Sequence, residues 1–130
     1  MTSAFGFGKA VEYSADEAIA KVTDALKAEG FGVLADIDVA AKINKELGTD
    51  MQAYRILGAC NPVLANRAIS EVPDIGLLLP CNVLVRGLDE NRAEVSFMDP
   101  EAVLSLVDHP QVAELAVDVK ARLTRVRDAL

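Results

Sequence analysis

A long, one-sided apolar pattern at residues 110–130 constrains the fold of this chain more than any other feature of its sequence. Apolar residues recur there at the spacing of one helical face. They are Val112, Leu115, Ala116, Val119, Leu123, Val126 and Leu130. The stripe covers only about three heptads, which favours a helix packed on a sheet over a coiled coil. The rest of the chain must therefore supply a sheet for this helix to cover.

Strand and helix patterns alternate along the preceding residues. Five strands are predicted over residues 5–13, 31–39, 52–59, 75–86 and 92–98. Shorter helical segments are predicted over residues 15–29, 40–47, 61–71 and 100–107. Ser14 and Glu17 form a capping box at the first of these helices, and Gly30 ends it. Asn61 followed by Pro62 is a strong start for another helix.

Three details of this pattern predict where side chains point. In the second strand, the apolar residues Phe31, Val33, Ala35 and Ile37 share one parity, which predicts a common buried face. In the short helix over 40–47, the sequence predicts that Ala40, Ile43 and Leu47 point inward. The run over 75–86 is almost wholly apolar, which predicts one buried strand. Pro80 within it predicts a bulge or an edge position.

The order of these elements predicts an α+β fold in a single domain over residues 1–130. Turn residues at 87–91 join the last two strands, so we expect that pair to be antiparallel. The strands do not alternate strictly with crossover helices, which argues against a parallel sheet. We therefore expect an α+β sheet with helices on one face. Its core order would be strand, helix, four strands, helix, with short inserted helices.

Charge and composition exclude several classes of function. The 13 Lys and Arg residues face 20 Asp and Glu residues, for a formal net charge of −7. Phosphate contacts need clustered cations, so we expect no nucleic-acid partner, and no docking on an anionic membrane. There is no apolar run of about 20 residues, and residues 1–6 lack the regions of a secretory signal. We expect a cytoplasmic protein.

The segment that ends the third strand is the most informative for chemistry. Gly58 and Ala59 are small, Cys60 follows, and Asn61 starts a helix. Backbone N–H groups and the dipole at a helix start stabilise anions, so Cys60 is a candidate thiolate nucleophile, persulfide carrier or soft-metal ligand. The alternative is a small buried cysteine that happens to precede a helix cap.

A second Cys-Asn pair, Cys81 and Asn82, lies inside the apolar run. An Asn there is costly unless its amide finds partners. If the third and fourth strands are neighbours, Cys60 and Cys81 could bind Cu(I), form a reversible disulfide or line one pocket, whereas the alternative is core packing. Tyr54 could donate a hydrogen bond to a ligand. Two cysteines are too few for a disulfide scaffold, and a metal, if any, would use this pair.

An enzyme with Cys60 as nucleophile would need a base. The candidates are Tyr54, Asp38, Lys42, Lys45 and the single histidine, His109. Nothing in the sequence places any of them beside Cys60, and no phosphate-binding glycine motif is present. The cofactor, if there is one, is not specified by the sequence.

Three runs, GFGVLADIDV, YRILGACNP and PDIGLLLPCNVLV, resemble the domain-of-unknown-function 302 family over nearly the whole chain. The resemblance implies a small α+β domain with one antiparallel sheet backed by helices, similar in topology to the TATA-box-binding protein, and it implies homodimers. It carries no established activity. The matching positions are Cys60, Asn61 and Pro62 in one motif, and Pro80, Cys81 and Asn82 in the other.

Our leading hypothesis is a homodimer that binds a small ligand at the two Cys-Asn pairs, where the ligand is a sulfur species, a thiol or a soft metal. Cys60 would be the reactive thiol, Cys81 its partner, and Asn61 and Asn82 the polar groups that orient the ligand. A sulfur-carrier protein could be a partner. The alternatives are a sulfur- or acyl-transfer enzyme that uses Cys60, and a structural module with both cysteines in its core.

Overall fold

A computed structural model describes residues 3–130, so Met1 and Thr2 of the N-terminal segment lie outside the described residues. Its strands are β1 (Gly6–Val11), β2 (Gly32–Asp38), β3 (Tyr54–Cys60), β4 (Cys81–Asp89) and β5 (Arg92–Met98). Its helices are α1 (Ala15–Ala28), α2 (Val39–Leu47), α3 (Pro62–Glu71), η1 (Pro73–Leu78), α4 (Pro100–Leu104) and α5 (Pro110–Asp128), of which η1 is a 3-10 helix. The strands form one antiparallel sheet in the order β1-β5-β4-β3-β2.

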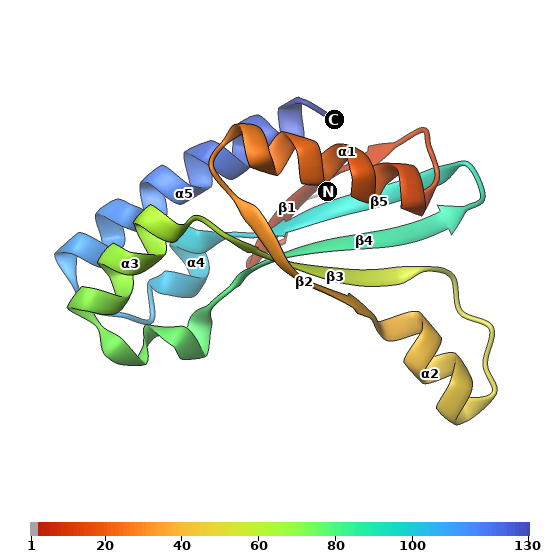
Figure 1. Cartoon of the computed structure of the whole chain (residues 1–130), viewed down its shortest axis with the longest axis horizontal. Helices are drawn as coiled ribbons and strands as arrows, with labels where there is room; N and C mark the ends of the chain where they lie inside the picture. The colour runs from red at the N-terminus through yellow and green to blue at the C-terminus, as the bar shows by residue number, and fades with distance from the viewer. Residues whose placement is uncertain (1–2) are drawn as a thin grey trace.

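Helices α1 and α5 lie side by side over one face of this sheet (Figure 1). The apolar stripe of α5 is buried as its spacing predicts, from Val112 through Val126, in a core that helices and strands share. Alternate residues of the central strands belong to the same core, including Val83, Val85 and Val95. The predicted α+β fold with an antiparallel sheet is therefore confirmed, and so is the antiparallel pairing of β4 with β5.

Side-chain caps fix the helix starts where the sequence places them. Ser14 Oγ accepts the Glu17 N–H at 3.2 Å, and Asp38 Oδ1 accepts the Ala41 N–H at 2.9 Å. Each bond satisfies a backbone donor that the helix itself leaves free. Helix α1 ends at Ala28, and Gly30, just past its C-cap Glu29, has a φ of 85°, the left-handed conformation that favours glycine.

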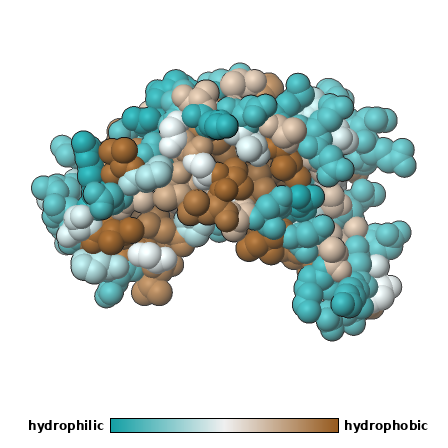
Figure 2. Space-filling view, in the orientation of Figure 1, coloured by the Kyte–Doolittle hydropathy of each residue, from teal (hydrophilic) through white to brown (hydrophobic). Residues whose placement is uncertain are grey.

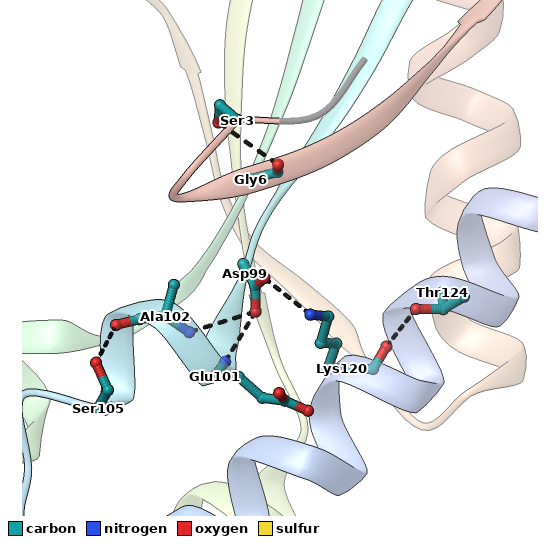
Figure 3. Close-up of polar contacts among 8 residues, drawn as sticks. All are labelled: Ser3, Gly6, Asp99, Glu101, Ala102, Ser105, Lys120 and Thr124. Atoms are coloured by element: carbon teal, nitrogen blue, oxygen red, sulfur yellow. Dashed lines mark hydrogen bonds and ion pairs between the residues drawn. The ribbon is translucent and has the colours of Figure 1, made fainter.

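Asp99 fixes the turn from β5 into the last two helices (Figure 3). Its Oδ1 accepts the N–H groups of Glu101 and Ala102, which caps α4. Its Oδ2 accepts from Lys120 Nζ of α5 at 2.9 Å. Burial raises the pKa of the Asp99 carboxyl, but these bonds more than offset that effect and hold its pKa below the usual value. One carboxylate thus ties α4 to α5, and both helices contribute to the cavity described below.

The apolar run over 75–86 is not one strand, so that prediction is wrong. Pro73–Leu78 forms the 3-10 helix η1, and the strand begins only at Cys81. Pro80 has no N–H to donate to a sheet ladder, so it precedes β4 instead of lying within it. The Leu79–Pro80 peptide bond is cis. Because β4 is central, between β3 and β5, Pro80 marks neither a bulge nor an edge.

The predicted buried face of β2 is also wrong. The register with β3 shifts between Val33 and Ala35, which breaks the parity of the apolar residues, and Ile37 is 54% exposed. In α2, Ala40 is buried as predicted, but Leu47 is 72% exposed. The reason is architectural, since β2 is an edge strand and α2 stands away from the layer of α1 and α5 (Figure 1).

Candidate functional site

A cavity of about 480 Å³ lies where β3 ends and β4 begins. Helix α3 and η1 form much of its wall, α5 contributes Leu115 and Val119, and β2 contributes Leu34 and Ala35. Apolar side chains gather over β2 and over α3 and η1 on the same face of the molecule (Figure 2). The volume of the cavity falls within the range of about 300–1,000 Å³ that is typical of small-molecule sites.

Both cysteines lie on the wall of this cavity, and both are free thiols. They come together because β3 and β4 are hydrogen-bonded neighbours in which Ala59 pairs with Cys81. Cys60 follows Ala59 as the last residue of β3, one position along the ladder from Cys81. Cys60 is half-buried, whereas Cys81 is 8% exposed. The sequence left open whether the two thiols are neighbours, and the structure places both on the wall of one cavity.

The two thiols differ in their electrostatics. Burial, together with the neighbouring Cys60 thiol, raises the pKa of Cys81 to about 11. A buried thiol ionises less readily because the thiolate loses its hydration. At neutral pH, Cys81 is therefore a neutral thiol. Of the pair, Cys60 is the more accessible to a reagent.

Asn61 joins the cysteines on the cavity wall, as the first motif predicts. Its side chain is 8% exposed, and its Oδ1 accepts the Leu64 N–H at 3.2 Å to cap α3. This bond takes the Leu64 N–H, and Pro62 has no N–H, so the first turn of α3 has two fewer donors for an anion. The helix start therefore offers Cys60 fewer free N–H groups than the sequence suggests.

Asn82 and Tyr54 do not lie with the cysteines. Side chains alternate along a strand, so Asn82 faces away from Cys81, toward the sheet face that α1 and α5 leave open. Asn82, Tyr54, Arg86 and Ser96 are among the residues that line a second hollow there, of about 670 Å³. The two Cys-Asn pairs therefore contribute three of their four side chains to one cavity, and Asn82 contributes to the other.

Sequence reasoning missed most of the apolar wall. Leu34, Leu64, Ala68 and Ile75 all line the cavity, yet nothing in their spacing separates them from ordinary core residues. The small residues Ala65 and Ala68 on α3 are the one local signal, because their short side chains leave room beside the thiols. That signal has meaning only once α3 is known to face the end of β3.

None of the five candidate bases lines this cavity. His109 caps α5 through Nδ1, and its Nε2 lies 3.4 Å from Glu71 Oε2. Asp38 caps α2. Tyr54 lies on the open face of the sheet. The side chains that would activate Cys60 for group transfer are therefore engaged elsewhere or are not part of the wall.

Two absences concern the described residues 3–130. No three side chains among their His, Cys, Asp and Glu residues come together in a way that could hold a metal ion. A site made from Cys60 and Cys81 would thus supply two protein ligands, fewer than the four of a structural zinc site. No helix in this part of the chain has the length and apolar character to cross a membrane.

Comparisons with known proteins identify the family. Residues 7–130 match the model of the family described as domain of unknown function DUF302. The crystal structure of an uncharacterized conserved DUF302 protein from Bacillus stearothermophilus superimposes with a TM-score of 0.88 at 29% sequence identity, over 98% of each chain. No curated protein matches the chain. The chain therefore belongs to the DUF302 family.

Proposed function

We propose that this protein binds a small ligand in the cavity between β3, β4 and α3, with Cys60 as the thiol that reacts with or contacts it. The observation that supports this proposal most directly is that both cysteines of the chain line one cavity of about 480 Å³. Cys81 then acts as a neutral neighbour, and Asn61 is the polar side chain that orients the ligand. Asn82 has no part in this site, because it faces the other side of the sheet.

Among the ligands that the motifs suggest, the cavity favours an organic thiol or an organic sulfur species over a soft metal. Two cysteines are the full set of strong soft ligands on the wall, and one of them is buried as a neutral thiol. An organic sulfur compound needs only one accessible thiol, and Cys60 supplies it. Binding is preferred to catalysis of sulfur or acyl transfer, since no candidate base lines the cavity.

Thiol–disulfide exchange with dithiodipyridine tests the proposal. The Cys60 thiolate attacks one sulfur of this aromatic disulfide, a Cys60–S–S–pyridine bond forms, and the released thiopyridone absorbs light. We expect one fast equivalent in the wild type and in Cys81→Ser, and none in Cys60→Ser. Release that begins only in denaturant, in all three proteins, would favour the structural module with core cysteines.

We also propose that the protein is a cytoplasmic homodimer. Large apolar side chains that face solvent in a single chain support the dimer, among them Phe5, Ile37 and Leu47. Two free cysteines fit a reducing compartment. Sedimentation equilibrium at micromolar concentration is the test for the dimer, and a monomer at all concentrations would contradict it.

A further inference from the structure

The wall of the cavity carries no charged side chain among the described residues. Its polar side chains are Cys60, Asn61 and Cys81, and the remaining lining residues are aliphatic, aromatic, glycine or proline. Burial keeps Cys81 uncharged at neutral pH. A ligand that brings a charge into such a place loses hydration and gains no counter-ion, which is unfavourable.

The size of the cavity points away from the smallest candidate ligands. A hydrosulfide or a single metal ion occupies a space comparable to one water molecule, about 30 Å³. The cavity is many times larger, so such a ligand would leave most of the apolar wall facing water. A molecule with a sizeable hydrocarbon or aromatic body would cover that wall and gain the free energy of apolar burial.

The mouth of the cavity has the same character. Leu34 of β2 is 72% exposed and Ile69 of α3 is 47% exposed, and both contribute to the lining. Exposed leucine and isoleucine at the rim of a pocket favour a ligand whose apolar surface continues to the opening. Neither residue has a charged neighbour on the cavity wall.

We infer that the ligand of this cavity is a neutral organic molecule with an apolar aromatic or acyl body, and that it enters between Leu34 and Ile69. This inference rests on the proposed function and narrows its ligand class. The apolar body lies between α3, η1 and the end of the sheet. The polar part of the ligand lies at Asn61 and Cys60, where the wall offers an amide and an accessible thiol.

The experiment compares two fluorescent probes that share one aromatic skeleton, neutral N-phenylnaphthylamine and its anionic relative anilinonaphthalene sulfonate. Each is titrated into the wild-type protein, and the rate of Cys60 alkylation by iodoacetamide is measured with and without probe. We expect the neutral probe to bind about tenfold more tightly than the sulfonate, given the cost of a buried unpaired charge, and to slow alkylation of Cys60.

Matched variants locate the binding. Ala65→Phe places a ring in the cavity, whereas Val63→Phe changes an exposed residue of the same helix that does not line it. Leu34→Asp charges the rim, and Leu77→Asp charges an exposed residue of η1 that does not line the cavity. We expect Ala65→Phe and Leu34→Asp to weaken neutral-probe binding about tenfold, and the two controls to match the wild type.

The outcomes separate this inference from the proposed function. If both probes bind equally and both protect Cys60, the inference fails while the proposed function stands. If the neutral probe binds without protecting Cys60, or binds all four variants alike, it binds elsewhere and the inference fails. If neither probe binds and Cys60 also fails to exchange with dithiodipyridine, both fail together. Should Ala65→Phe not fold, Leu34→Asp and its control decide, because both lie at exposed positions.

Discussion

Replacing Gly30 with alanine tests how tightly the backbone before β2 is fitted to the cavity. Gly30 has a φ of 85°, and a Cβ at this position would stand 2.9 Å from Asn61 Nδ2. That amide cannot easily move aside, because Asn61 is buried and its Oδ1 holds the Leu64 N–H. The substitution therefore strains the backbone and pushes on the cap of α3 at the same time.

The expected loss of stability follows from these two effects. An L-residue in the left-handed region costs about 1–2 kcal/mol. Crowding a packed group adds roughly 1–3 kcal/mol, and the more restricted unfolded chain returns about 0.4–1 kcal/mol. We expect Gly30→Ala to lower the free energy of unfolding by about 1–4.5 kcal/mol, the net of these contributions.

Gly48→Ala is the matched control. Gly48 also has a positive φ, of 65°, but nothing lies within 4 Å of a Cβ placed there. Only the backbone strain applies, so we expect a loss of about 1 kcal/mol. Urea unfolding followed by circular dichroism measures both variants against the wild type. Equal losses in the two variants would refute the claim that Gly30 is packed against the cap of α3.

Three further predictions concern single side chains. Asn61→Ala removes the cap of α3 and should cost about 1 kcal/mol in urea unfolding, whereas Asn61→Ser, whose neutral hydroxyl can still cap, should cost less; equal losses would exclude the capping role. Because the folded pKa of Cys81 is raised to about 11, its contribution to stability is present below the unfolded pKa of about 8.5 and is lost as pH rises through the folded value. Stability should therefore fall more steeply over this interval in the wild type than in Cys81→Ala. The folded pKa of Asp99 is lowered, so its stabilising contribution is present above the unfolded pKa of about 3.9 and is lost as pH falls through the folded value. The stability of Asp99→Asn should therefore depend less on acid pH than that of the wild type. An unchanged dependence would contradict the bond from Lys120.

Much of the fold follows from local patterns. The stripe of α5, the caps at Ser14 and Asn61, and the hairpin between β4 and β5 depend on residues close together in sequence, and the structure confirms them. The prediction of one strand over 75–86 was wrong because hydrophobicity alone does not distinguish a strand from a buried turn of helix. Pro80 then fixes where the strand can begin.

The candidate site was only partly predictable. Cys60 and Asn61 are neighbours in sequence, so their joint position at the start of α3 follows from the helix signal. That Cys81 joins them depends on the adjacency and register of β3 and β4, which no local pattern specifies. Parity in β4 could have separated Asn82 from Cys81, but only once the strand was known to begin at Cys81.

The pH dependence of alkylation at each cysteine tests the central claim most directly. Iodoacetamide rates are measured from neutral to alkaline pH in the native protein, with mass-spectrometric assignment of the modified residue. We expect Cys60 to react in the folded protein at neutral pH, while Cys81 stays slow until the pH approaches about 11. Two thiols that stay inert at every pH short of unfolding would contradict a ligand-accessible cavity, and would leave both cysteines as core residues.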